Sequence, residues 1–146
     1  MEDARSLRRL AGIKQRVEKR MREDAARLKG KVDQLHGEEL EAERRLREGR
    51  MMVAAATQAR HAEMASRPAS RKELAALFAG IECDQQSLQR KAADLGERRQ
   101  AHAAAVVERS EHNRRLTRVQ RQCEGLDTLI RAADAAAEVR AEFEQD

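Results

Sequence analysis

The sequence predicts an all-α fold, a single long antiparallel two-helix coiled-coil hairpin. A seven-residue apolar repeat runs through the second half of the chain, and a matching repeat runs through the first half. The chain's only proline, Pro68, lies between the two repeats. Such a repeat keeps its side chains on one side only when the chain is an α-helix wound around a partner helix. We therefore expect residues 1–146 to form one helical hairpin domain.

The composition supports a coiled coil. Charged residues make up 38% of the chain and aromatic residues 1%, which is typical of coiled coils rather than of globular domains. Disorder is the alternative reading of so much charge. The regular spacing of Leu, Ile and Val argues against disorder, because these side chains need a partner surface. A two-helix layer has little interior, so we expect no enclosed pocket and no small-molecule substrate.

The first helix is predicted over about residues 3–66. From Ala25 onward its apolar positions alternate in steps of three and four, as in a heptad repeat. The step from Met21 to Ala25 inserts four extra residues, which is a stutter that locally unwinds a supercoil. We therefore expect a change of twist near Met21.

The turn is predicted over about residues 67–69. Arg67 precedes Pro68 and is therefore disfavoured in helical geometry. Ser70 and Glu73 have the spacing of a capping box, in which each side chain binds a free backbone N–H of the other residue. A connection this short folds two helices back antiparallel.

The second helix is predicted over about residues 70–143. Its repeat of sevens comprises Leu74, Ile81, Leu88, Leu95, His102, Arg109, Leu116, Cys123, Ile130 and Ala137. A partner set follows four residues after each member, beginning Phe78, Gln85, Ala92, Arg99 and Val106. Together the two sets predict one continuous contact face toward the first helix.

In an antiparallel hairpin, residues whose numbers sum to about 137 should face each other. This rule places Leu10 against Leu126, and Ala42 against Leu95. It also places Glu39 opposite Arg98 and Arg99. The seam is therefore predicted to include Leu10, Leu28, Leu35, Leu88, Leu95, Leu116, Leu126 and Ile130.

The formal net charge of +4 conceals a strong asymmetry. Residues 1–30 carry ten Lys or Arg against five Asp or Glu, and residues 111–123 carry four against one. The hairpin places these segments side by side as one basic zone, which is either a solvated flank or a docking site for an acidic protein. Nucleic acid is disfavoured, because the zone lacks aromatic stacking platforms and the tail at 124–146 is acidic.

The segments beside the turn are more apolar than one seam requires. Residues 51–56 read Met-Met-Val-Ala-Ala-Ala, and residues 74–81 face them with Leu77 and Phe78 among others. A helix needs only one apolar stripe toward its partner, so the surplus predicts a second contact surface. The alternative is that Ala serves as a good helix former and Phe78 fills the end of the seam.

No motif of catalysis, metal binding or membrane insertion is present in the sequence. The four histidines are scattered along the chain, so we expect no metal site and no cofactor. Cys83 and Cys123 lie too far apart on one helix to form a disulfide, and Cys123 has the spacing of a small seam residue. The expected protein is a cytoplasmic non-enzyme that contacts other proteins.

The chain resembles the YscO/HrpO family of type III secretion stalk proteins. The resemblance lies in its length, a hairpin that turns just before mid-chain, the basic N-terminal arm and the Ser70–Glu73 turn. FliJ is the flagellar counterpart of this family. The resemblance implies a monomeric stalk that enters the hexameric secretion ATPase and links it to the cytoplasmic domain of an export-gate membrane protein. It further implies secretion chaperones as partners, a location peripheral to the inner membrane, and a role in virulence or symbiosis.

By position, the resemblance implies two sets of contact residues. The candidates for facing the ATPase are Arg8, Arg9, Arg16, Lys19, Arg20, Arg115 and Arg118. The candidates for facing the export gate are Met52, Leu77 and Phe78. The alternative function is a coiled-coil scaffold or adaptor that self-associates through its surplus apolar surface.

Overall fold

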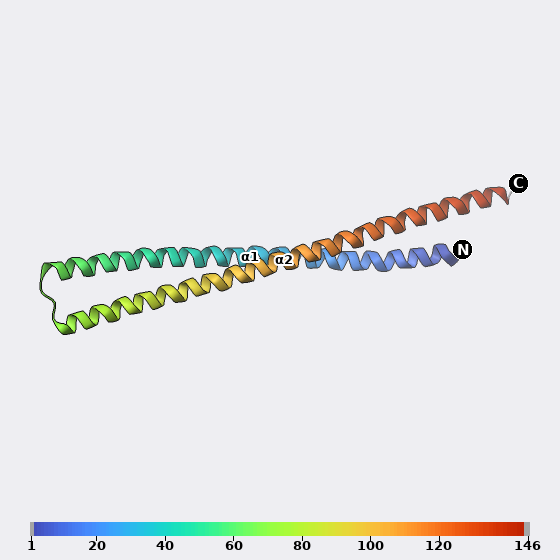
Figure 1. Cartoon of the computed structure of the whole chain (residues 1–146). Helices are drawn as coiled ribbons and strands as arrows, with labels where there is room; N and C mark the ends of the chain where they lie inside the picture. The colour runs from blue at the N-terminus through green and yellow to red at the C-terminus, as the bar shows by residue number, and fades with distance from the viewer. Residues whose placement is uncertain (1, 145–146) are drawn as a thin grey trace. The chain divides into compact units, whose positions relative to one another are not determined.

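The chain folds into two long α-helices joined by a short turn in a computed structural model that describes residues 2–144 (Figure 1). Helix α1 spans Glu2–Ser66 and helix α2 spans Arg71–Phe143. The described residues include no β-strand. The helices pack against each other, so the predicted all-α helical hairpin is confirmed.

Two compact units divide the chain. The turn unit is Val32–Ala105, and the terminal unit combines Met1–Lys31 with Val106–Asp146. In the turn unit, Arg60 binds Asp84 at 2.7 Å. In the terminal unit, the Lys14 ammonium donates a hydrogen bond to the Gln122 side chain at 2.9 Å. Within each unit, earlier residues of α1 meet later residues of α2, so the pairing is antiparallel.

The turn between the helices is stabilised by a capping box. The Ser70 backbone N–H donates to the Glu73 carboxylate at 2.8 Å, and the Glu73 N–H donates to the Ser70 hydroxyl at 3.2 Å. The first backbone bond of α2 runs from the Leu74 N–H to the Ser70 carbonyl at 3.0 Å. Arg67 adds an ion pair to Glu73 at 2.9 Å. The residues around Pro68 therefore bind the start of α2 instead of continuing α1.

The buried seam is thin. In the turn unit Ala42, Leu46 and Leu95 form a cluster, with Leu88 packed against it. The predicted contact between Ala42 and Leu95 is thus present. Leu35 is half-buried in this unit. In the terminal unit the buried residues are Ala11 and Cys123, and the half-buried seam residues include Leu28, Leu116, Leu126 and Ile130.

The second set of seam positions on α2 was assigned wrongly from the sequence. Its predicted members Phe78, Gln85, Ala92, Arg99 and Val106 are all exposed. The buried or half-buried residues instead follow three positions after the first set, and include Leu77, Asp84, Lys91, Ala105, His112, Val119 and Leu126. Charged residues at several of these positions masked the repeat, while Phe78 and Val106 supplied apolar residues at the wrong spacing. Leu74 and Ala137 of the first set are also exposed.

Polar seam residues find partners on the facing helix. Asp84 binds Arg60. Lys91 lies over Gly49, where a Cβ in place of the glycine hydrogen would come within 2.9 Å of the lysine nitrogen. A glycine at this buried position therefore leaves room for the long Lys91 side chain, which a larger residue would displace.

The predicted stutter near Met21 is not present in the burial pattern of the terminal unit. Burial in α1 follows Leu7, Ala11, Lys14, Glu18 and Met21, with alternating steps of four and three. The apolar residues alone suggested a break because two of these seam positions, Lys14 and Glu18, are polar. Leu10, predicted in the seam, is instead 43% exposed, and its neighbour Ala11 occupies the seam at 6% exposed.

Truncation of Leu95 tests the buried seam. We expect Leu95→Ala to lower the free energy of unfolding by about 2 kcal/mol or more, because this side chain is 5% exposed. Leu40→Ala is the matched control, since Leu40 lies in the same unit but is 52% exposed. Urea unfolding followed by circular dichroism measures both variants. Equal losses of stability would contradict the assignment of the seam.

Neutralisation of Glu73 tests the capping box. The Ser70 backbone N–H and the Arg67 guanidinium lower the pKa of Glu73 below its usual range. Because the pKa of Glu73 is lower in the folded than in the unfolded protein, its carboxylate stabilises the fold above the usual glutamate pKa of about 4.3. This stabilisation is lost as the pH falls through the lowered pKa. Glu73→Gln should therefore lower the urea midpoint at pH 7 and lose this difference in acid. Glu97→Gln, at an exposed position of α2, should have no such pH-dependent effect.

Candidate functional site

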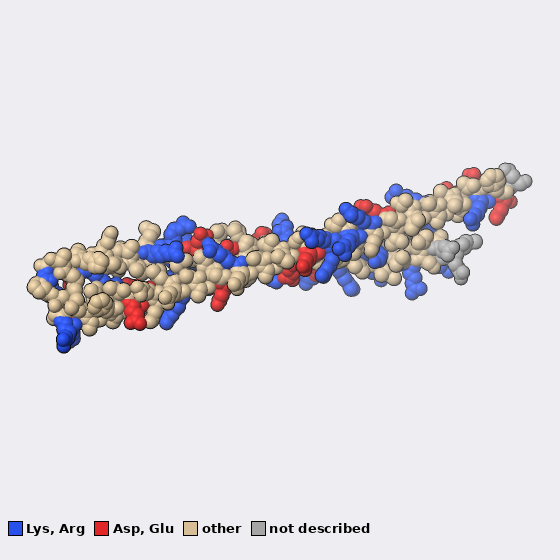
Figure 2. Space-filling view, in the orientation of Figure 1, with Lys and Arg blue, Asp and Glu red and all other residues tan. Residues whose placement is uncertain are grey.

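The basic surface of the terminal unit contains the predicted ATPase-facing residues. All seven are exposed: Arg8, Arg9, Arg16, Lys19, Arg20, Arg115 and Arg118. The contacts of Lys14 with Gln122 and of Met21 with His112 bracket most of them, so α1 residues 16–20 lie alongside α2 residues 113–121. Figure 2 shows basic side chains gathered along this unit. The structure thus places Arg16, Lys19 and Arg20 in the same stretch of the terminal unit as the two arginines of α2.

Ion pairing differs among these residues. Arg8 binds Asp134 of α2, so it is already engaged within the chain. Among the described residues, no carboxylate lies within ion-pair distance of Arg16, Lys19 or Arg20, nor of the two α2 arginines at 115 and 118. Arg22 and Arg27 pair locally along α1. Of the seven predicted residues, only Arg8 therefore has a carboxylate partner among the described residues, and the unneutralised cations are Arg9 and those at residues 16–20 and 115–118.

The seam beneath this basic surface is polar and holds the thiol of Cys123. Cys123 is 8% exposed, and the half-buried Lys14 and Glu18 occupy seam positions of α1. Burial raises the pKa of the Cys123 thiol, and the Glu18 carboxylate raises it further. A thiol kept protonated in this way is a poor nucleophile and a poor metal ligand. Cys123 is a seam residue, as its spacing predicted.

The predicted export-gate residues do not form one patch. Met52 and Phe78 are 72% and 66% exposed, whereas Leu77 is half-buried and lines a hollow beside the turn. Gly49 lies against Leu88, and Gly80 lies against Arg60. These contacts place Met52 and Phe78 roughly two helical turns apart along the turn unit. The face of the turn unit seen in Figure 2 is largely uncharged, but basic side chains lie at the turn itself.

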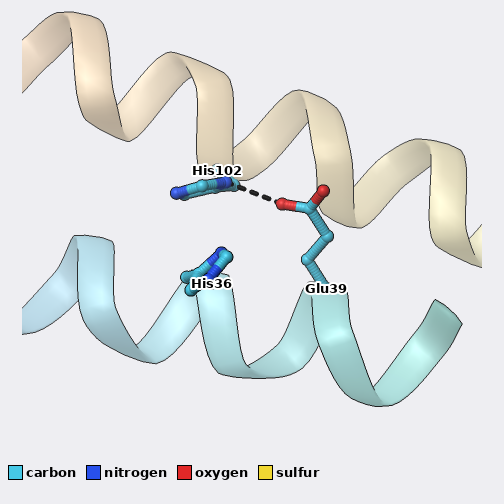
Figure 3. A group of neighbouring side chains, drawn as sticks. All are labelled: His36, Glu39 and His102. Carbon is cyan, nitrogen blue, oxygen red and sulfur yellow. Dashed lines mark hydrogen bonds and ion pairs between the residues drawn. The ribbon is translucent and has the colours of Figure 1, made fainter. Parts of the chain in front are cut away.

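A cluster of His36, Glu39 and His102 was missed by sequence reasoning, which treated the histidines as scattered. The His36 and His102 rings lie 5.0 Å apart between centroids, and His102 Nδ1 lies 2.6 Å from a Glu39 carboxylate oxygen (Figure 3). All three belong to the turn unit, with two from α1 and one from α2. The pairing rule could have found the cluster, because it places His36 opposite residue 101, next to His102.

The other two histidines lie elsewhere. His112 Nε2 donates a hydrogen bond to the Met21 backbone carbonyl at 2.7 Å, which turns this half-buried ring toward α1. His61 is exposed on α1. Among the described histidines, only His36 and His102 therefore lie close enough together to share a site.

No described helix combines the length and the apolar character that crossing a membrane requires. Comparison of the sequence with protein-family models, with curated proteins and with solved structures gives no match. The functional interpretation therefore depends on the residues and their geometry.

The two cysteines should differ in reactivity. Cys83 is exposed on α2, and Cys123 is buried with a raised pKa. We expect iodoacetamide at neutral pH to alkylate Cys83 much faster than Cys123 in the folded protein, and to alkylate both at similar rates in concentrated denaturant. Peptide mass spectrometry of timed samples measures both sites in one reaction. Comparable rates in the folded protein would contradict the buried placement of Cys123.

Proposed function

We propose that the chain is a non-enzymatic stalk of a type III secretion apparatus, which inserts into the hexameric secretion ATPase and couples it to the export gate. The observation that carries the proposal is the basic surface of the terminal unit. Its central cations are exposed and have no carboxylate in pairing distance among the described residues. An acidic surface of a partner ring would neutralise them.

The helical architecture is compatible with this role. Paired helices α1 and α2 have only small clusters of buried residues, so most side chains face outward and are available for contacts. Electrostatic complementarity of such a surface with a partner accelerates docking and selects the partner, more than it tightens the complex. A component that must move relative to a motor benefits from fast and reversible contacts of this kind.

The exposed apolar residues of the turn unit supply the second contact in the proposal. Met51, Met52 and Phe78 are each more than half exposed. Methionine side chains adapt their shape to a partner surface, which suits contact with a gate domain. The proposed partners are thus the ATPase at the terminal unit and the cytoplasmic domain of the export gate at the turn unit, with secretion chaperones as further partners.

The same exposed apolar residues favour a second candidate, a coiled-coil scaffold that self-associates. Two copies could cover Met52 or Phe78 of each other, whereas the stalk should be a monomer when free. Light scattering at micromolar concentration distinguishes the two functions. A stable dimer that becomes monomeric in Phe78→Asp would replace the stalk proposal with the scaffold.

Charge reversal tests the stalk proposal. The double variant Arg16→Glu and Arg20→Glu should weaken binding to a purified hexameric secretion ATPase by about tenfold, or ~1.4 kcal/mol, at low salt. It should also reduce any stimulation of ATP hydrolysis by the native chain. Helicity should be unchanged, because both side chains are exposed.

The control reverses two other exposed cations. Arg50 and Arg90 lie in the turn unit and have no carboxylate in ion-pair distance among the described residues. Arg50→Glu with Arg90→Glu makes the same change in net charge but should leave ATPase binding largely intact. Equal weakening by both pairs would show a non-specific charge effect, and no binding by the native chain at low salt would reject the proposed function.

A further inference from the structure

We propose that His36, Glu39 and His102 form a binding site for a divalent transition-metal ion such as Zn²⁺, which ties α1 to α2 within the turn unit. Each residue offers one ligand atom, and these three atoms all lie within 4.8 Å of one another. Figure 3 shows the two rings and the carboxylate converging on the space between the helices. This site is independent of the proposed secretion function.

The donor set suits zinc and related ions. Two imidazoles and one carboxylate form a common zinc ligand set, with a remaining position for water. Imidazole nitrogen selects Zn²⁺, Co²⁺ or Ni²⁺ over Mg²⁺ and Ca²⁺, which prefer all-oxygen sites. The chemistry of the ligands therefore predicts the class of ion.

The positions of the ligands on the helices also fit a metal site. His36 and Glu39 are three residues apart on α1, so their side chains share one helix face. His102 reaches them from α2. Glutamate and histidine three residues apart on one helix, in the order Glu then His, hold metal ions in four-helix bundles together with ligands from the facing helices. His36 and Glu39 have the same spacing in the reverse order. An ion bound here would connect the two helices directly.

The existing contact can open to admit an ion. His102 Nδ1 lies 2.6 Å from the Glu39 oxygen, at hydrogen-bond distance, so a proton on the ring nitrogen is donated to the carboxylate. An ion with bonds of about 2.0–2.1 Å to each ligand would replace that proton and separate the two atoms to roughly 3.3 Å. The side chains of His102 and Glu39 are 23% and 19% exposed, and His36 is exposed, so small rotations of their ends are feasible and the ion can enter from solvent.

Arg99 opposes the ion and limits its affinity. Its Nε lies 3.6 Å from the second oxygen of Glu39, and its Nη2 lies 4.0 Å from a Glu43 oxygen. This positive charge competes with a cation for the Glu39 carboxylate. Replacement of Arg99 by glutamine should therefore strengthen metal binding, an effect that a purely structural hydrogen bond between His102 and Glu39 does not predict.

Titration of the purified full-length chain with Zn²⁺ tests the site. Isothermal calorimetry should give one ion per chain, and Co²⁺ should give the visible absorption of a nitrogen- and oxygen-ligated ion. Zinc at a hundredfold excess over its dissociation constant should raise the thermal midpoint by roughly 5–10 °C. Mg²⁺ at the same concentration should change none of these readouts.

Variants identify the ligands. His36→Ala should weaken Zn²⁺ binding at least tenfold while helicity is retained, because this residue is exposed. His102→Ala should have a similar effect, and Arg99→Gln should tighten binding several-fold. His61→Ala is the matched control, since His61 is an exposed histidine of the same helix and unit, and it should bind Zn²⁺ as the native chain does.

The proposal is overturned by any of three results. The first is no Zn²⁺ binding at micromolar concentration, and the second is binding that survives His36→Ala. The third is one ion per two chains, which would assign the ligands to an interface between copies. If His102→Ala fails to fold, the His36→Ala and Arg99→Gln variants still decide between a metal site and a simple hydrogen bond.

Discussion

The narrow seam between α1 and α2 is the constraint on which the remaining structure depends. Its buried apolar residues are few, and several are small, including Ala11, Ala42 and Ala105. Small side chains let helices approach closely but contribute little buried area each, so stability is distributed along the seam rather than concentrated in one core. Among the described residues, no large side chain is completely buried. Binding chemistry is therefore confined to the surface and to the edges of the seam.

Polar residues in the seam define how the helices align. Arg60 with Asp84, and Glu39 with His102, are partly buried pairs that form only in this alignment. The His112 ring likewise reaches one particular backbone carbonyl, that of Met21. A shift by one heptad would separate these partners and leave their polar atoms poorly satisfied, at a cost that alanine and leucine contacts alone would not impose. The seam thus exchanges some apolar burial for a single defined register.

Local signals predicted the fold, and the register between the helices limited prediction of the site. The heptads, Pro68 and the Ser70–Glu73 box are local features, so the two helices and their turn could be derived from the sequence. The seam assignment failed where an apolar residue is exposed rather than buried, as at Phe78 and Leu10. The histidine cluster joins two segments distant in the sequence, so no local pattern reveals it, and only the pairing rule for the hairpin places His36 within one residue of His102. Its ligands are common residues on an otherwise ordinary charged helix pair.

The exterior of the two units gives unequal support to a function. Exposed apolar residues such as Met52 and Phe78 are common on proteins, and these two lie too far apart to make one continuous patch. The basic surface is more informative, because neighbouring cations repel one another and natural helices usually offset them with carboxylates at a spacing of three or four residues. Part of the turn unit follows that rule, as Arg44 binds both Glu41 and Glu48. Arg16 has no carboxylate at that spacing, while Glu23 and Asp24 stand at that spacing from Arg20 without forming an ion pair with it. In the proposed function, an acidic partner surface neutralises both arginines.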